Sequence, residues 1–178
     1  ISWGINMKIS KKNIKWIIAI ALIMALFVGI VWFAYSSLIP PDKEKTEEYL
    51  QSDKDDLIIV VDFLNNLDYS FVHIDESNIE NGTMFTGAYT REQKIENKTV
   101  LKALKKILNS KNYEKIVKND NTVYFQKWSF LQQERGIAFN TNEEESLSVE
   151  YLIKSETLSE PGWYFYEADY EEYRNQKG

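Results

Sequence analysis

Residues 16–35 read WIIAIALIMALFVGIVWFAY, twenty consecutive residues without a charged side chain. A helix of that length spans about 30 Å, which is the thickness of the hydrocarbon core of a bilayer. Aromatic residues lie near both ends of the run, where amphipathic rings favour the headgroup level: Trp16, Trp32 and Tyr35. A helix in a soluble core is seldom apolar on every face over such a length. The run therefore predicts a single transmembrane helix, with the lipid bilayer as its partner.

The charges that flank this run predict its orientation. No acidic residue occurs in residues 1–35, and four lysines precede the run: Lys8, Lys11, Lys12 and Lys15. The segment that follows, residues 36–41, carries no charge. By the positive-inside rule, residues 1–15 are expected in the cytoplasm and the chain beyond the run outside the cell membrane.

The N-terminal region leaves two alternatives open. Met7 followed by lysines resembles the start of an exported protein, so we expect residues 1–6 to lie upstream of the native start; a fragment of a longer protein is the other interpretation. A cleavable signal peptide has an apolar region of about 7–15 residues before a small-x-small site. Here the apolar run is longer, and Ala34-Tyr35-Ser36 is the only fair site. We expect an uncleaved signal-anchor, and both interpretations export the remainder.

Three small residues recur at four-residue spacing on one face of the predicted helix: Ala21, Ala25 and Gly29. Small residues placed in this way allow two transmembrane helices to approach closely. Alanine and glycine are also common in membrane helices for no such reason. The spacing suggests self-association, or contact with an envelope protein, through this face.

Composition excludes several kinds of site. The 178 residues include no cysteine and one histidine, so disulfides, thiolate metal sites and thiol nucleophiles are ruled out, and we expect no cofactor. Four of the 21 basic residues precede the apolar run, which leaves 17 against 27 acidic residues and a net charge of −10 for residues 36–178. A body of that charge is not expected to bind nucleic acid through a phosphate clamp.

The remaining chain is expected to comprise a charged linker, residues 36–51, and an extracytoplasmic domain, residues 52–178. Apolar residues recur at helical spacing after residue 52, which predicts a helix over about 54–67: Leu57, Val60, Val61, Leu64 and Leu67. The β-branched run at 58–61 leaves a buried strand as the alternative. A second helix is expected from a cap at Asn97 to Ser110, and residues 87–96 are expected to form a loop.

Short alternating segments indicate strands in the rest of the domain. They cover residues 69–74, 83–86, 113–117, 122–130, 135–141, 147–154 and 163–166, and a charged tail follows at 169–174. Consecutive short strands joined by short loops pair antiparallel. We therefore expect an α+β fold in which about two helices pack on an antiparallel sheet of five to seven strands.

Two groups of residues are candidates for chemistry. His73 and Asp75 are two residues apart on a predicted strand, so their side chains share one face. Such a pair could orient a hydroxyl nucleophile in a small enzyme, with Glu76 as a further carboxylate. The companion motifs of such enzymes are absent, so a packed histidine is the ordinary alternative. Trp163, Tyr164 and Tyr166 form an aromatic cluster beside carboxylates, which would suit sugar stacking or peptide recognition, although core packing is the ordinary alternative.

Together these features predict a single-pass, membrane-anchored domain of a bacterial cell envelope that acts by binding, or as an accessory subunit, rather than by catalysis. The alternatives are a small exported enzyme that uses carboxylates with His73, and a sugar- or peptide-binding module released by signal cleavage.

Overall fold

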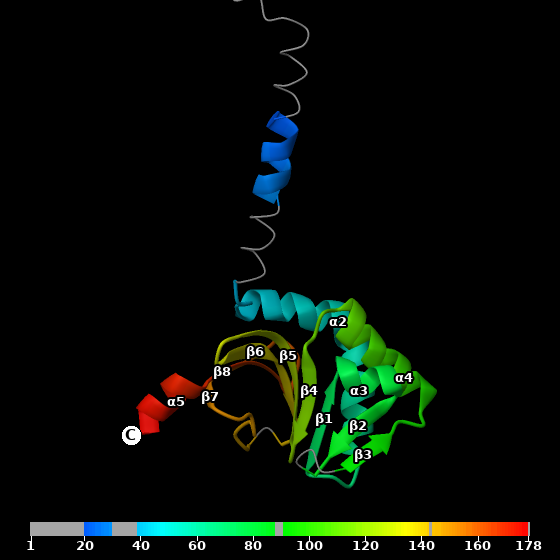
Figure 1. The fold of residues 1–178 in the computed structure, drawn as a ribbon. Helices are drawn as coiled ribbons and strands as arrows, with labels where there is room; N and C mark the ends of the chain where they lie inside the picture. The colour runs from blue at the N-terminus through cyan, green and yellow to red at the C-terminus, as the bar shows by residue number, and fades with distance from the viewer. Residues whose placement is uncertain (1–19, 30–38, 88–90, 143, 178) are drawn as a thin grey trace, which may run out of the picture. The chain divides into compact units, whose positions relative to one another are not determined.

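The computed structural model describes residues 20–29, 39–87, 91–142 and 144–177, and Figure 1 shows their arrangement. The chain divides into two compact units, residues 1–39 and 40–178, which are described separately. In the first unit, residues 20–29 form an α-helix on which every side chain is exposed. Its large apolar side chains are 58–67% exposed: Ile20, Leu22, Ile23, Met24, Leu26, Phe27 and Val28.

The predicted membrane span lies only partly within the described residues. Residues 16–19 and 30–35 are outside them, and the helix that is described has ten of the twenty residues of the apolar run. Among the described residues, no helix is both long enough and apolar enough to cross a bilayer. The transmembrane helix therefore stays a prediction.

The second unit contains an eight-stranded sheet, antiparallel throughout, in the order β3-β2-β1-β4-β5-β6-β8-β7. The strands are β1 (Phe71–Asp75), β2 (Thr83–Thr86), β3 (Arg91–Lys94), β4 (Lys115–Asn119), β5 (Thr122–Phe130), β6 (Gln133–Asn140), β7 (Leu152–Thr157) and β8 (Trp163–Asp169). The helices are α2 (Lys43–Asn65), α3 (Glu76–Asn81), α4 (Lys98–Lys105), the π-helical turn η1 (Lys106–Ser110) and α5 (Tyr170–Lys177). The α+β expectation is confirmed, with one strand more than the predicted maximum of seven.

Alternation along the strands gives the sheet two buried faces. On the helix face, side chains such as Ile116, Phe125 and Ile137 pack with Leu57 of α2 and Leu104 of α4 into the main core. On the opposite loop face, a second cluster includes Val117, Tyr124 and Tyr166, and it is covered by Leu147 and Val149 of the β6–β7 connection. Because both faces are covered, aromatic residues of either parity along a central strand become buried.

The structure corrects the predicted linker. Residues 43–51 form the first half of α2, the N-cap residue Asp42 accepts a hydrogen bond from the Lys45 amide at 2.8 Å, and residues from Pro40 onward belong to the same compact unit as the sheet. Thr46 and Leu50 are fully buried. The prediction was wrong here because this part of α2 buries only one narrow stripe. Its remaining faces carry mostly charged and polar side chains, so its composition resembles that of a linker.

Three further segments differ from expectation. Residues 91–94 are not loop but the edge strand β3, whose charged, largely exposed side chains protect the edge of the sheet. The connection between the strands expected at 69–74 and 83–86 is not a simple loop, since it contains the short helix α3, which ends with Gly82 at φ +71° as the C-cap. Leu147 and Val149 are buried but lie outside the strands, and β7 begins at Leu152, after Tyr151 with φ +54°.

A buried lysine joins the sheet to the end of α2. Lys118 of β4 points to the helix face, is 7% exposed, and its Nζ donates to the carbonyl oxygens of Leu64 and Leu67 at 3.0 and 2.9 Å. A positive charge at these carbonyls complements the negative end of the helix. Burial lowers the pKa of Lys118, while Asp68 and Asp120 act in the opposite direction.

Candidate functional site

The predicted histidine–carboxylate pair lies on the loop face, where β1 leads into α3. His73 Nε2 lies 3.1 Å from Asp75 Oδ2, so the two side chains share a face as their spacing predicted. Asp75 is also the N-cap of α3: its Oδ1 accepts from the Asn78 amide at 3.1 Å and from Ser77 Oγ at 2.6 Å. Glu76, the third predicted member, follows in the first turn of the helix.

The order of these groups differs from that of a hydrolytic triad. In a triad the imidazole lies between the hydroxyl and the carboxylate, so that it can remove the hydroxyl proton. Here the Asp75 carboxylate lies between Ser77 and His73. Burial raises the pKa of Asp75, but the hydrogen bonds from Ser77, the Asn78 amide and His73 outweigh it and hold the pKa below its usual value. Asp75 therefore acts as an ionised helix cap and hydrogen-bond acceptor.

An acidic hollow lies beside this pair. Its volume is about 530 Å³, and it is lined by Asp75, Glu76, Ser77, Glu80 and Glu114. Glu114 is already engaged, because its carboxylate accepts from Gln126 Nε2 and from Ser129 Oγ. Within the described part of the chain, no group of three or more histidine, aspartate or glutamate side chains could hold a metal ion. The hollow is therefore a polar surface suited to contact with a basic or hydrogen-bonding group.

Two buried polar atoms on the loop face have no hydrogen-bond partner among the described residues: Tyr166 Oη and Gln126 Oε1. Their residues flank Gly136 in register across β5, β6 and β8. A Cβ atom at Gly136 would lie 2.0 Å from the Phe125 carbonyl oxygen, so a side chain cannot fit between them. Burial, followed by the charge of Glu134, the neighbouring Tyr124 and the charge of Glu114, raises the pKa of Tyr166 well above its usual value. The phenol is thus a neutral, unused proton donor.

The predicted aromatic platform does not form. Trp163 points to the helix face and is 4% exposed, with its ring 5.0 Å from that of Phe139. Tyr164 and Tyr166 point to the loop face, where Tyr166 is fully buried and packs on Tyr124 at 5.6 Å. Only Tyr164 is partly exposed. The three rings therefore cannot jointly stack on a sugar or a peptide, because alternation along β8 sends them to opposite faces.

An exposed apolar surface that was not predicted from the sequence lies at the β5–β6 turn. Leu131 is 90% exposed at φ +56°, and Phe130 beside it is 48% exposed. The ring of Trp128 lies 6.4 Å from that of Phe130. We call Trp128, Phe130 and Leu131 the hairpin tip. The signal was present in the sequence, as WSFL directly before the polar QQE, but it was interpreted only as the end of a strand.

The three small residues of the predicted association face lie on the described helix over residues 20–29. Ala21, Ala25 and Gly29 are exposed there, and no atom of the described residues lies within 4 Å of the position that a Cβ of Gly29 would take. Association through this face stays a prediction.

Comparison of the chain with protein-family models, with curated proteins and with solved structures gives no match.

Proposed function

We propose that this chain is a single-pass membrane protein whose residues 16–35 span the bilayer, with the N-terminus in the cytoplasm and the α+β domain outside. The observation that carries the proposal is the charge-free run of twenty residues, of which 20–29 are helical with apolar side chains 58–67% exposed. Water would surround those side chains on every face of the helix, whereas a bilayer covers all faces at once.

The charge distribution supports the orientation. The four lysines before the run favour the cytoplasmic side, while residues 36–178 carry a net charge of −10. A domain of that charge is repelled by anionic surfaces and by nucleic acid. A protein partner in the envelope, or a second copy that contacts the face of Ala21, Ala25 and Gly29, is the interaction that this arrangement favours.

Binding is favoured over catalysis by the geometry of the polar cluster. The hydroxyl of Ser77 is bonded to Asp75 rather than to His73, so the imidazole does not activate it. The neighbouring hollow of about 530 Å³ is an acidic surface, and a basic patch on a partner would complement it. The domain is accordingly proposed as a binding or accessory subunit of a membrane complex.

Alkaline carbonate extraction of membranes tests the anchor. We expect the unaltered chain to remain in the membrane pellet. A variant with Leu22→Lys and Phe27→Lys should move to the supernatant, because each charge near the helix centre costs about 3 kcal/mol on insertion. The matched control, Leu22→Phe with Phe27→Leu, keeps the apolar character and should stay in the pellet. Release of the unaltered chain by carbonate would refute the anchor.

Intact mass of the membrane-extracted protein separates the anchor from a signal peptide. The proposal predicts that the apolar run is retained. A product that begins at Ser37, after the Ala34-Tyr35-Ser36 site, would instead support the signal-cleaved binding module.

A further inference from the structure

The hairpin tip is an apolar surface on an acidic domain, at a position where the fold does not require an apolar residue. Leu131 has φ +56°, a left-handed conformation that glycine or asparagine adopts more readily than leucine. Its side chain is 90% exposed, so it gains little from the core in return. Packing within the domain therefore does not explain the strained, exposed Leu131 beside the exposed Phe130, whereas an external contact would cover both side chains.

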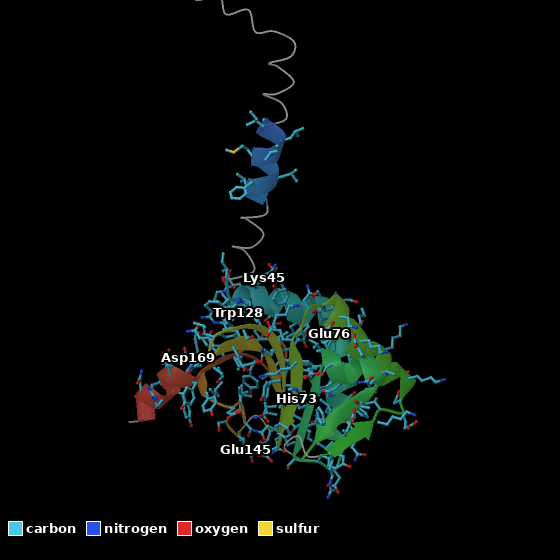
Figure 2. The ribbon with its side chains drawn as sticks, viewed as in Figure 1. Lys45, His73, Glu76, Trp128, Glu145 and Asp169 are labelled. Carbon is cyan, nitrogen blue, oxygen red and sulfur yellow. The ribbon has the colours of Figure 1, made fainter. Side chains whose placement is uncertain are left out.

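The tip lies at the end of the domain where the chain enters α2. Arg135 of β6 donates from Nη1 to the Pro41 carbonyl oxygen at 3.3 Å, and Lys127 of β5 places its Nζ 4.5 Å from the Tyr49 ring. These contacts join β6 to Pro41, just before α2, and β5 to the N-terminal half of α2. Figure 2 labels Trp128 and Lys45 at this end of the domain and Glu145 toward the opposite end.

Covalent connection limits how far this end can lie from the apolar run. Five residues, 36–40, separate Tyr35 from Pro41. A fully extended chain of that length spans about 20 Å. If residues 16–35 span the bilayer, Pro41, which accepts a hydrogen bond from Arg135 of the hairpin, lies within about that distance of the membrane surface.

We propose that the hairpin tip docks on the outer surface of the same bilayer, with Trp128, Phe130 and Leu131 at the level of neutral or zwitterionic headgroups. Tryptophan and phenylalanine side chains favour this level. Anionic headgroups are not the expected ligand, because Asp169 and Glu171 line the hollow of about 670 Å³ beside the tip. This inference rests on the proposed membrane anchor, since the tether brings the tip to the lipid.

Fluorescence quenching in full-length protein, reconstituted in phosphatidylcholine vesicles, tests the proposal. The chain has no cysteine, so single cysteines can carry an environment-sensitive dye. The sites are Gln132→Cys beside the tip, Glu145→Cys on the far loop and Ala25→Cys in the apolar run. Lipids carry a nitroxide quencher either at the headgroup or deep in the acyl chain. We expect at least about twofold quenching at 132 by the headgroup nitroxide, little at 145, and quenching at 25 by the deep nitroxide.

A matched variant keeps the dye at 132 and replaces the tip with Phe130→Ser and Leu131→Asn. Asparagine tolerates the left-handed conformation, so the fold should persist, and circular dichroism checks it. Quenching at 132 should then fall by more than about half.

Each other outcome is decisive. Quenching at 25 without quenching at 132 would overturn the docking and leave the anchor intact, and a protein partner would then be the occupant of the tip. Quenching at 132 that survives the tip substitutions, or equals that at 145, would also overturn it. Absence of quenching at 25 would refute the anchor itself.

Discussion

Two buried tyrosines show how differently one residue type is used in this domain. Tyr113 donates from Oη to Asp53 Oδ2 at 3.1 Å, and Asp53 is 2% exposed and also pairs with Lys111 Nζ at 2.9 Å. Tyr166 is fully buried, and within the part of the chain that the structure describes its hydroxyl has no hydrogen-bond partner. The first hydroxyl stabilises a buried carboxylate, whereas the second bears a desolvation cost that the fold does not offset.

Removing these hydroxyls should therefore have opposite effects. Tyr113→Phe should lower the free energy of unfolding by about 1–3 kcal/mol, because a buried charge loses a donor. Tyr166→Phe should leave it unchanged or raise it by about 1 kcal/mol. Urea unfolding of the full chain in detergent measures both. A loss above about 1 kcal/mol for Tyr166→Phe would show that its hydroxyl has a partner after all.

Lys127 gives the domain a pH dependence on the alkaline side. Its Nζ lies 4.1 Å from the Tyr113 ring and 4.5 Å from the Tyr49 ring, and it donates to the Lys111 carbonyl oxygen. Burial lowers its pKa to about 8; the charge of Asp53 raises it and that of Lys111 lowers it further. Between pH 8 and the usual value of 10.5, the unfolded chain holds more protons at this residue than the folded chain.

The stability contribution of Lys127 should consequently rise with pH across that window and be constant below it. Urea unfolding from pH 7 to 10 should show the unaltered chain gaining stability relative to Lys127→Met. A difference between the two proteins that stays flat, or that falls with pH, would contradict the lowered pKa.

At the scale of elements, the apolar pattern correctly predicted the helices and strands whose signals, such as a cap residue or a turn, lie within the segment itself. The helix at 98–110 appeared with its cap: Asn97 Oδ1 accepts from the Thr99 and Val100 amides at 3.0 and 3.2 Å. The two strands around Asp120 also formed the expected hairpin. The edge strand β3 could not be predicted in this way, because its side chains are mostly charged and exposed and show no apolar pattern. It is a strand because it pairs with β2.

The candidate site was predictable to a similar extent. Spacing of two along a strand placed His73 and Asp75 together, but it gave no sign that Asp75 also caps α3. Alternation along β8 could not predict which aromatic rings are exposed. The loop face of β8 is covered by residues of the β6–β7 connection, and a pattern within β8 itself carries no information about that contact.

The N-terminal half of α2 offers a direct test of the corrected domain boundary. Leu50 is fully buried in a segment whose composition resembles a linker. Leu50→Ala should lower the free energy of unfolding by about 2–4 kcal/mol, as in other cores. The exposed neighbour Glu48, changed to alanine, should cost less than about 0.5 kcal/mol. Equal, small effects at both positions would mean that this segment does not belong to the fold.

At the scale of the whole molecule, the chain has a charge-free apolar run preceded by basic residues. An acidic domain follows, which buries both faces of an eight-stranded sheet. The domain is tied to the run by a short segment, so its N-terminal end and the hairpin tip are proposed to work at the membrane surface. The acidic hollow beside Asp75, lined also by residues of α3, is proposed as the surface that a basic partner would contact.

Cysteine accessibility in intact cells tests the proposed topology most directly. Single cysteines are placed before the run with Ser10→Cys and on the exposed β6–β7 connection with Ser146→Cys, in a chain that has no other cysteine. A maleimide that cannot cross membranes should label position 146 in intact cells and position 10 only after permeabilisation. Labelling of position 10 with protection of position 146, or protection of both, would contradict an anchored domain that faces outward.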